Sequence, residues 1–264
     1  KIIFILFILI NSLLGIQKIL IPMDIAQTNH LKAYGIAFWS LKNNNQVEWL
    51  LNYRGGSFLL DISNQLKKEC MLRNVHYKIV SIEDISMIYA TIEEENMEIV
   101  ILEKIPKIAV YSPPDKQPWD DAVTLALTYA EIKYDVIFDS EIMDGELYKY
   151  DWLHLHHEDF TGQYGKFYRY RNQDWYKNME YSFLLNAKKY GFNTVHNFKK
   201  TIALKIKDYI NNGGFLFAMC SATDSFDIAL SYYIPDFVHQ VYDGTPIDQN
   251  YLSKINYSYG IAFE

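Results

Sequence analysis

The carboxyl-terminal part of the sequence alternates short apolar runs with longer amphipathic stretches, and this alternation restricts the possible folds more than any other feature. We expect strands at residues 108–111, 134–138, 151–156 and 215–219, and helices at residues 118–130, 175–190 and 198–210. Strands that alternate with helices form a parallel sheet through right-handed crossovers, with helices on both faces. Residues 106–264 are therefore predicted to form an α/β domain with a doubly wound, mostly parallel sheet.

Residues 16–105 are predicted to form a smaller α+β unit. Its expected elements are a β-hairpin of Tyr34–Leu41 and Val47–Tyr53, helices at 61–73 and 83–95, and strands at 75–80 and 97–102. The segment Arg54-Gly55-Gly56-Ser57 is interpreted as a turn, because no phosphate-binding G-x-x-x-x-G-K-[ST] pattern accompanies its glycines. Cys70 falls at helical spacing with apolar residues, so we interpret it as a packing residue.

The first fifteen residues resemble a secretory signal peptide. Lys1 is followed by an apolar run, and then by the small or polar residues Asn11, Ser12 and Gly15. The run is shorter than the roughly 20 residues that span a bilayer. We expect a secreted or periplasmic protein that meets a membrane only through this leader during export; the alternative is a buried first strand or helix. The end at Glu264 is interpreted as a carboxyl-terminal truncation.

Charge and cysteine content exclude several classes of protein. The formal net charge of −7 argues against nucleic acid as the main partner. The two cysteines are too few for a disulfide framework, and they form no C-x-x-C motif. We expect the partner to be a small-molecule or glycan substrate.

Ligands of open α/β sheets bind beyond the carboxyl ends of the strands, which locates the expected site. The loops after the predicted strands carry polar and aromatic residues there. We expect substrate contacts from Asp115, Asp159, Gly162, Tyr164, Ser221 and Asp224. A polar loop is also predicted at this edge for residues 139–145.

The segment from Asp151 to Tyr168 holds three of the seven histidines. Strand alternation predicts Trp152, His154 and His156 on one face of the sheet, with two leucines on the other. The spacing of His154, His156 and Glu158 suits a divalent transition metal such as zinc or iron, which would make the protein a metal-dependent hydrolase. The alternative is that His154 is a hydrogen-bonded core histidine while the residues after it cap or solvate a loop.

Cys220 is a second candidate for catalysis. It lies between an apolar strand and the segment Ser221-Ala222-Thr223-Asp224, which matches a capping box and predicts a helix start. A helix amino terminus stabilises a thiolate, and the next backbone amide could stabilise an oxyanion. His156, His157 and Glu158, from the histidine loop, are the expected catalytic partners of this nucleophile. The alternative is a buried, unreactive thiol.

A family resemblance rests on four motifs. They are L-N-Y-R-G-G-S-F, Y-S-P-P-D-K-Q-P-W-D-D-A-V, Y-D-W-L-H-L-H-H-E-D-F-T-G-Q-Y-G-K-F-Y and G-G-F-L-F-A-M-C-S-A-T-D-S-F-D. Through them, the chain from Ile21 to about Ile234 resembles exported bacterial proteins commonly labelled asparagine synthetase B. Its carboxyl-terminal part is similar to the class I glutamine amidotransferase fold, which is flavodoxin-like and implies a nucleophilic cysteine at a strand-to-helix elbow, the position of Cys220.

The resemblance implies an amidotransferase-like hydrolase acting on an amide, but not asparagine synthesis. The pyrophosphate loop S-G-G-x-D-S of asparagine synthetases is represented only by Cys220-Ser221-Ala222-Thr223-Asp224-Ser225, without the glycines. The cysteine elbow G-x-C-x-G is A-M-C-S-A in this sequence. A third hypothesis is a non-catalytic module that binds a sugar or peptide through the aromatic-rich segment 160–170.

Overall fold

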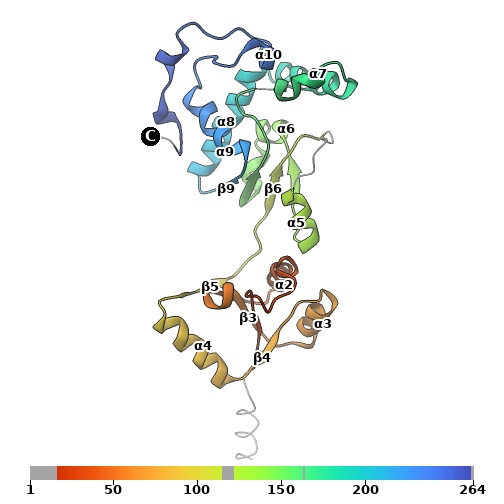
Figure 1. Cartoon of the computed structure of the whole chain (residues 1–264), viewed down its shortest axis with the longest axis vertical. Helices are drawn as coiled ribbons and strands as arrows, with labels where there is room; N and C mark the ends of the chain where they lie inside the picture. The colour runs from red at the N-terminus through yellow and green to blue at the C-terminus, as the bar shows by residue number, and fades with distance from the viewer. Residues whose placement is uncertain (1–16, 115–121, 163, 263–264) are drawn as a thin grey trace, which may run out of the picture. The chain divides into compact units, whose positions relative to one another are not determined.

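The computed structural model describes residues 17–114, 122–162 and 164–262, without the side chains of residues 164–166. The predicted signal peptide and Asp115 lie outside these ranges. The chain divides into two compact units (Figure 1). The amino-terminal unit comprises the described residues up to Ile105 together with Ala122–Ile132, and the carboxyl-terminal unit comprises the rest.

The amino-terminal unit is built on a five-stranded antiparallel sheet with the order β4-β1-β3-β2-β5. The strands are β1 (Lys18–Ile21), β2 (Val47–Leu51), β3 (Ser57–Asp61), β4 (Lys78–Val80) and β5 (Glu98–Leu102), and the helices are α2 (His30–Lys42), α3 (Asn64–Leu72), α4 (Ile82–Glu94) and α5 (Ala122–Ala130). One apolar cluster joins the sheet to α2 and α3, and a second joins it to α4. Because successive side chains of a strand point to opposite faces, helices cover both faces of this sheet.

The predicted β-hairpin is wrong in its first half, where residues 34–41 belong to helix α2. The aromatic and aliphatic composition of this segment is typical of a strand, but its buried residues Ala33, Ile36 and Ala37 follow helical spacing. The Asn29 side chain accepts a hydrogen bond from the backbone nitrogen of Lys32 at 3.2 Å and so caps the first turn. Burial of one helical face outweighs the strand propensity of the individual residues.

The predicted turn at Arg54-Gly55-Gly56-Ser57 is confirmed between β2 and β3. Gly55 has φ +82°, and a Cβ there would lie 2.5 Å from the carbonyl oxygen of Met23. The glycine is therefore required both by the backbone conformation and by the close approach of the preceding chain.

Helix α5 packs against α2 within the amino-terminal unit, although the strand–helix alternation had placed it in the α/β domain. A Cβ at Gly35 would lie 2.0 Å from the carbonyl oxygen of Ala130, so glycine allows the two helices to approach closely. Just beyond α5, the carboxylate of Glu131 accepts hydrogen bonds from Lys32 at 2.6 Å and from Arg73 at 2.9 Å. Hydrogen bonding to Lys32, and then the charge and hydrogen bond of Arg73, lower the pKa of Glu131.

The carboxyl-terminal unit contains a four-stranded parallel sheet with the order β7-β6-β8-β9. The strands are β6 (Ile108–Tyr111), β7 (Asp135–Ile137), β8 (Trp152–Leu155) and β9 (Phe215–Ala218), and the α-helices are α6 (Asp139–Met143), α7 (Asp174–Lys189), α8 (Val195–Asn211), α9 (Ser221–Ser231) and α10 (Gln240–Asp243). All four predicted strands are confirmed to within a few residues at each end. The α/β class and the parallel sheet are therefore established.

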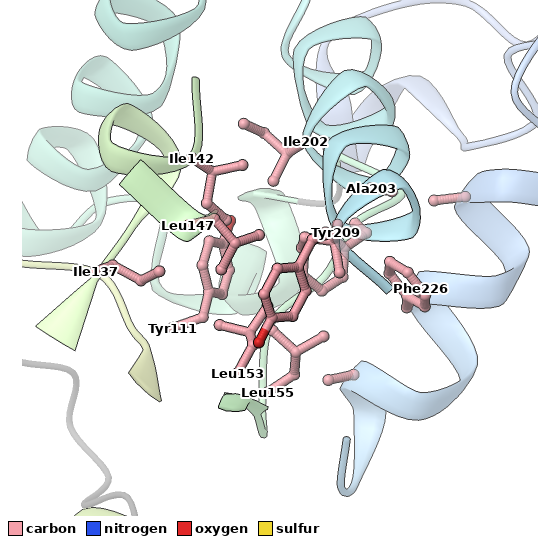
Figure 2. Close-up of a cluster of buried hydrophobic side chains, with 14 of the residues drawn as sticks. Tyr111, Ile137, Ile142, Leu147, Leu153, Leu155, Ile202, Ala203, Tyr209 and Phe226 are labelled. Carbon is pink, nitrogen blue, oxygen red and sulfur yellow. The ribbon is translucent and has the colours of Figure 1, made fainter. Parts of the chain in front are cut away.

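The core of this unit lies between the sheet and helices α6, α8 and α9 (Figure 2). Leu153 and Leu155 of β8 pack in one buried cluster with Ile202 and Ala203 of α8. Alternation along the strand places His154 on the opposite face, as predicted, where its ring lies 5.7 Å from that of Phe217. The register of β8 therefore separates the apolar core from the histidine face.

Two local predictions fail in this unit. Residues 139–143 form helix α6 instead of a loop, because the Glu141 carboxylate accepts a hydrogen bond from the backbone nitrogen of Phe138 at 2.9 Å and caps the turn. Helix α9 does begin at Ser221, but the predicted capping box is not formed, because Cys220 is the N-cap and makes no side-chain cap hydrogen bond. The Ser221 hydroxyl donates to the carbonyl of His157 at 3.1 Å. No helix in the described part of the chain combines the length and apolar character needed to cross a membrane.

Candidate functional site

The loop after β8 is bound to the start of α9 by several hydrogen bonds. Past the paired strands, the backbone nitrogen of Met219 donates to Leu155 at 2.9 Å, and that of Ala222 donates to His156 at 3.2 Å. The Ser225 hydroxyl donates to the carbonyl of Glu158 at 2.9 Å. These contacts hold the histidine loop against the first turns of α9, so two segments more than 60 positions apart in the sequence share one site.

Cys220 connects β9 to α9 with a backbone conformation that L-amino acids rarely adopt, φ +52° and ψ −137°. A residue in such a region costs about 1–3 kcal/mol and persists only where the surrounding structure imposes it. The side chain is exposed at the amino terminus of α9. A strained, solvent-accessible cysteine at a sharp strand-to-helix turn has the geometry of a nucleophile elbow.

The imidazoles of His156 and His157 lie beside this cysteine. Their rings stack with centroids 3.7 Å apart and planes inclined by 25°. One ring nitrogen of each and the Sγ of Cys220 all lie within 4.8 Å of one another. Both imidazoles are half-buried, whereas the thiol is exposed. The structure thus brings together three of the four predicted catalytic residues.

Glu158 and Asp159 shape the loop through their carboxylates. Oε2 of Glu158 accepts a hydrogen bond from the backbone nitrogen of His156 at 2.8 Å. Oδ1 of Asp159 accepts from the backbone nitrogen of Thr161 at 2.9 Å and from its hydroxyl. Each acid therefore fixes a tight turn two residues from itself, a local role that their positions in the sequence also allowed.

The metal ligand set expected from the sequence is not the one that the structure gathers. His154 is fully buried, and its ring centroid lies 5.9 Å from that of His156. Among the described residues, the group of ligand atoms around His156 consists of His156, His157 and Cys220, without His154 or Glu158. Alternation puts His154 on the same face as His156, but His154 lies inside the strand, whereas the other two histidines lie beyond its end.

The predicted substrate contacts have different surroundings. Asp224 is exposed in the first turn of α9, while the Ser221 hydroxyl is bound to the histidine loop. Gly162 is buried with φ +88°, and a Cβ there would lie 2.4 Å from Cα of His196, so this glycine permits close packing. Asp115 and the side chain of Tyr164 lie outside the described residues.

The aromatic side chains that the structure describes in segment 160–170 do not form one exposed surface. Phe160 is fully buried and stacks on Tyr111 at 5.3 Å. Tyr170 and Phe167 pack against Trp175 of α7, with ring centroids at 5.5 and 6.3 Å. Much of the aromatic surface proposed for ligand stacking is therefore used within the protein.

A buried polar network lies at the carboxyl ends of β6 and β7, and sequence patterns alone did not identify it. Lys199 of α8 donates to Oδ1 of Asp139 at 2.8 Å and to the hydroxyl of Tyr111 at 2.9 Å, and the Tyr111 hydroxyl also donates to Asp139. The Lys199 ammonium lies 4.4 Å from the centre of the Phe138 ring. Burial, and then the charge of Asp139, raise the pKa of Tyr111 well above its usual value.

A second buried cluster was also missed: His196 of α8 with Asp236 and Asp243 from the carboxyl-terminal segment. Ligand atoms of the three lie within 4.8 Å of one another. Burial raises the pKa of Asp243 to about 6 and lowers that of His196. Burial also lowers the pKa of neighbouring Lys200 to about 8. The sequence signal was weak, because these acids lie in a segment with no strand or helix periodicity.

A cavity of about 500 Å³ opens near the carboxyl ends of β6 and β7 in the carboxyl-terminal unit. Its lining is mostly apolar and includes Pro113 and Pro114 after β6, Phe138 after β7, and Phe183 and Asn186 of α7. It lies at the edge of the sheet where ligands of parallel sheets bind.

Comparison of the chain with protein-family models, with curated proteins and with solved structures finds no match.

Proposed function

We propose that the protein is a cysteine-dependent hydrolase of amide bonds, with Cys220 as its nucleophile. The observation that carries this proposal is the strained backbone of Cys220, φ +52° and ψ −137°, which presents an exposed thiol at the strand-to-helix turn. The two imidazoles within 4.8 Å provide a base. Burial of the other cysteine, Cys70, raises its pKa to about 12, so that thiol is unsuited to the role.

The proposed fold is the flavodoxin-like arrangement of class I glutamine amidotransferases. Support comes from the strand order β7-β6-β8-β9. Counted from β6 as the first strand, this order is 2-1-3-4, which is the start of the flavodoxin order 2-1-3-4-5. The elbow at Cys220 lies after the fourth strand of this count. The same proposal includes export of the protein, as its first residues suggest, and a small-molecule or glycan substrate.

The chemistry follows acyl transfer. The His156–His157 pair accepts the thiol proton, and the thiolate attacks the carbonyl carbon of the amide. The charge on the carbonyl oxygen develops near the amide of Ser221 and the positive end of α9. The tetrahedral intermediate breaks its C–N bond, and the imidazolium gives its proton to the departing amine. Water then attacks the thioester, releasing the acid and returning the proton to the thiolate.

Thiol reactivity tests this proposal, and Cys70 serves as the internal control. The native protein is treated with limiting iodoacetamide, and peptides are analysed by mass spectrometry over a pH series. We expect rapid labelling of Cys220 and none of Cys70. His156→Ala and His157→Ala should identify the base, because loss of the base should slow the labelling of Cys220. Labelling of Cys220 no faster than that of a model thiol peptide would refute the proposal.

Turnover is measured with an activated probe, p-nitrophenyl acetate, because the natural substrate is not identified. We expect an acetyl group on Cys220 and release of p-nitrophenolate that Cys220→Ser abolishes. Cys70→Ser is the matched control and should retain both. Equal turnover by Cys220→Ser and the unsubstituted protein would contradict the nucleophilic role.

A metal-dependent hydrolase is the second candidate function, supported by the proximity of His156, His157 and Cys220. Two imidazoles and one thiolate are zinc ligands, and a fourth position would hold water. The two candidates compete for one sulfur, since a zinc-bound thiolate is not available as a nucleophile. Two results would favour the metal enzyme: activity that requires added zinc, and protection of Cys220 from iodoacetamide when zinc is bound. Activity unaffected by a chelator would favour the thiol mechanism.

A further inference from the structure

A buried group of side chains in the carboxyl-terminal unit lies apart from the residues assigned to catalysis. His196 is the second residue of α8, Asp236 follows α9, and Asp243 ends α10. Their side chains are 8%, 10% and 0% exposed. Burying two carboxylates together is costly unless a cation or a shared proton compensates for their charge.

Both carboxylates are oriented by hydrogen bonds. Oδ1 of Asp236 accepts from the backbone nitrogen of Val238 at 3.1 Å, and Oδ1 of Asp243 accepts from that of Thr245 at 3.0 Å. The Thr245 hydroxyl donates to Oδ2 of Asp236 at 2.7 Å. The two backbone contacts are turns between each carboxylate and the amide two residues on, and they fix the direction in which each side chain points.

The inner oxygens of both carboxylates face Nδ1 of His196. Oδ2 of Asp236 lies 3.5 Å from this nitrogen, and Oδ2 of Asp243 lies 3.9 Å from it. Within the part of the chain that the structure describes, Oδ2 of Asp243 is buried and has no hydrogen-bond partner. A buried carboxylate oxygen that is directed into the cluster without a donor leaves an acceptor for a ligand.

The ammonium of Lys200 does not serve as the cation for Oδ2 of Asp243. This buried ammonium donates to the backbone carbonyl of Pro235 at 2.6 Å. One ammonium also balances only one of the two carboxylates. The charge of the cluster therefore favours an additional cation.

We propose that His196, Asp236 and Asp243 bind a divalent transition-metal ion, with zinc as the preferred ion. Ligand atoms of a tetrahedral zinc site lie about 3.3–3.6 Å apart, given bonds of about 2.0–2.2 Å. The observed 3.5 Å lies within that range, and the observed 3.9 Å needs only a small contraction to reach it. An imidazole ligand favours zinc over magnesium or calcium, which take oxygen ligands. The ion would fasten the segment from Asp236 to Thr245 to the start of α8.

Zinc binding is measured in a Cys220→Ala background, which removes the sulfur ligand of the other cluster. We expect equilibrium dialysis to give one bound zinc per chain and zinc to raise the unfolding temperature. Adding Asp243→Asn, which keeps the side-chain size, should weaken binding more than about 100-fold, because loss of a ligand exceeds the cost of losing a ligand's supporting contact. Asp224→Asn, at an exposed aspartate, is the matched control and should leave binding unchanged.

Cobalt gives a second readout that does not depend on activity. Cobalt in the Cys220→Ala protein should show the absorption of a site with nitrogen and oxygen ligands, without a sulfur-to-cobalt band. Magnesium added at the same concentration as cobalt should not displace the bound cobalt. If Asp243→Asn prevents folding, His196→Gln replaces it in the dialysis experiment. Absence of zinc binding in the Cys220→Ala protein, or binding unaffected by both ligand substitutions, would overturn the proposal.

Discussion

The backbone strain at Cys220 can be measured by comparing glycine with alanine at this position. Both substitutions remove the thiol, but only glycine adopts φ +52° and ψ −137° without steric cost. The strain in an L-residue is about 1–3 kcal/mol. At an ordinary helix N-cap, a protein with glycine is also more stable than one with alanine by about 0.5–1 kcal/mol. We therefore expect Cys220→Gly to be more stable than Cys220→Ala by about 1.5–4 kcal/mol.

Thr194 provides the matched control, since it is the N-cap of α8 in the same unit and has extended backbone, φ −135° and ψ 148°. The unfolding free energy of Thr194→Gly should exceed that of Thr194→Ala by only the ordinary N-cap difference of about 0.5–1 kcal/mol. Unfolding free energies of the carboxyl-terminal unit would come from urea titration combined with hydrogen exchange of peptides from β8, β9 and α9. At each position the result is the difference in unfolding free energy between the glycine and the alanine variant. If this difference at Cys220 agrees with that at Thr194 within about 0.5 kcal/mol, the strain is refuted, and with it the main support for the nucleophile.

Three further predictions concern other contacts. Lys199→Met leaves Asp139 as a buried carboxylate without its cation and should lower the unfolding free energy by about 3–5 kcal/mol. The double substitution Lys199→Met with Asp139→Leu should recover most of this loss, and simple additivity in this double-mutant cycle would contradict the prediction. Gly162→Ala should cost more unfolding free energy than Gly191→Ala, which has φ +82° but no atom within 4 Å of its Cβ position, and equal costs would exclude the predicted clash. Glu131→Gln should destabilise the amino-terminal unit at pH 7, and this cost should shrink as the pH falls below the usual value of 4.5 and disappear below the lowered folded pKa, because a carboxyl whose folded pKa is lowered contributes its full stability only above its usual pKa; a pH-independent effect in urea titrations would contradict this.

The sequence predicted the parallel sheet well because its strands are short and continuously apolar. Residues 108–111 are buried on both sides and show the run without alternation that such strands require. The segment 34–41 misled because its aromatic and aliphatic residues suit a strand or a helix equally, and only the burial of Ala33, Ile36 and Ala37 decides between them. The packing of α5 on α2 could not be predicted, because the approach at Gly35 depends on two distant segments.

The candidate site was predictable in location but not in detail. The rule that parallel sheets bind ligands beyond their strand ends predicts from the sequence that His156, His157 and Cys220 lie together. The backbone conformation of Cys220 has no signal in the residue type, because it results from the junction between β9 and α9. The cluster of His196, Asp236 and Asp243 was missed because its members meet only after the carboxyl-terminal segment folds back on α8.

Zinc binding at the two clusters can be distinguished because only one of the two ligand sets contains a sulfur atom. A site with Cys220 contributes sulfur, so bound zinc should block alkylation of the thiol, whereas zinc at His196 has no direct contact with it. The loop from His156 to Gly162 nevertheless connects them, since one end lies at Cys220 and the other packs on His196. Zinc stoichiometry and Cys220 labelling must therefore be measured on the same samples. One zinc per chain with full labelling assigns the ion to the aspartate cluster and leaves the thiol available for catalysis, while one zinc with complete protection assigns it to the cysteine.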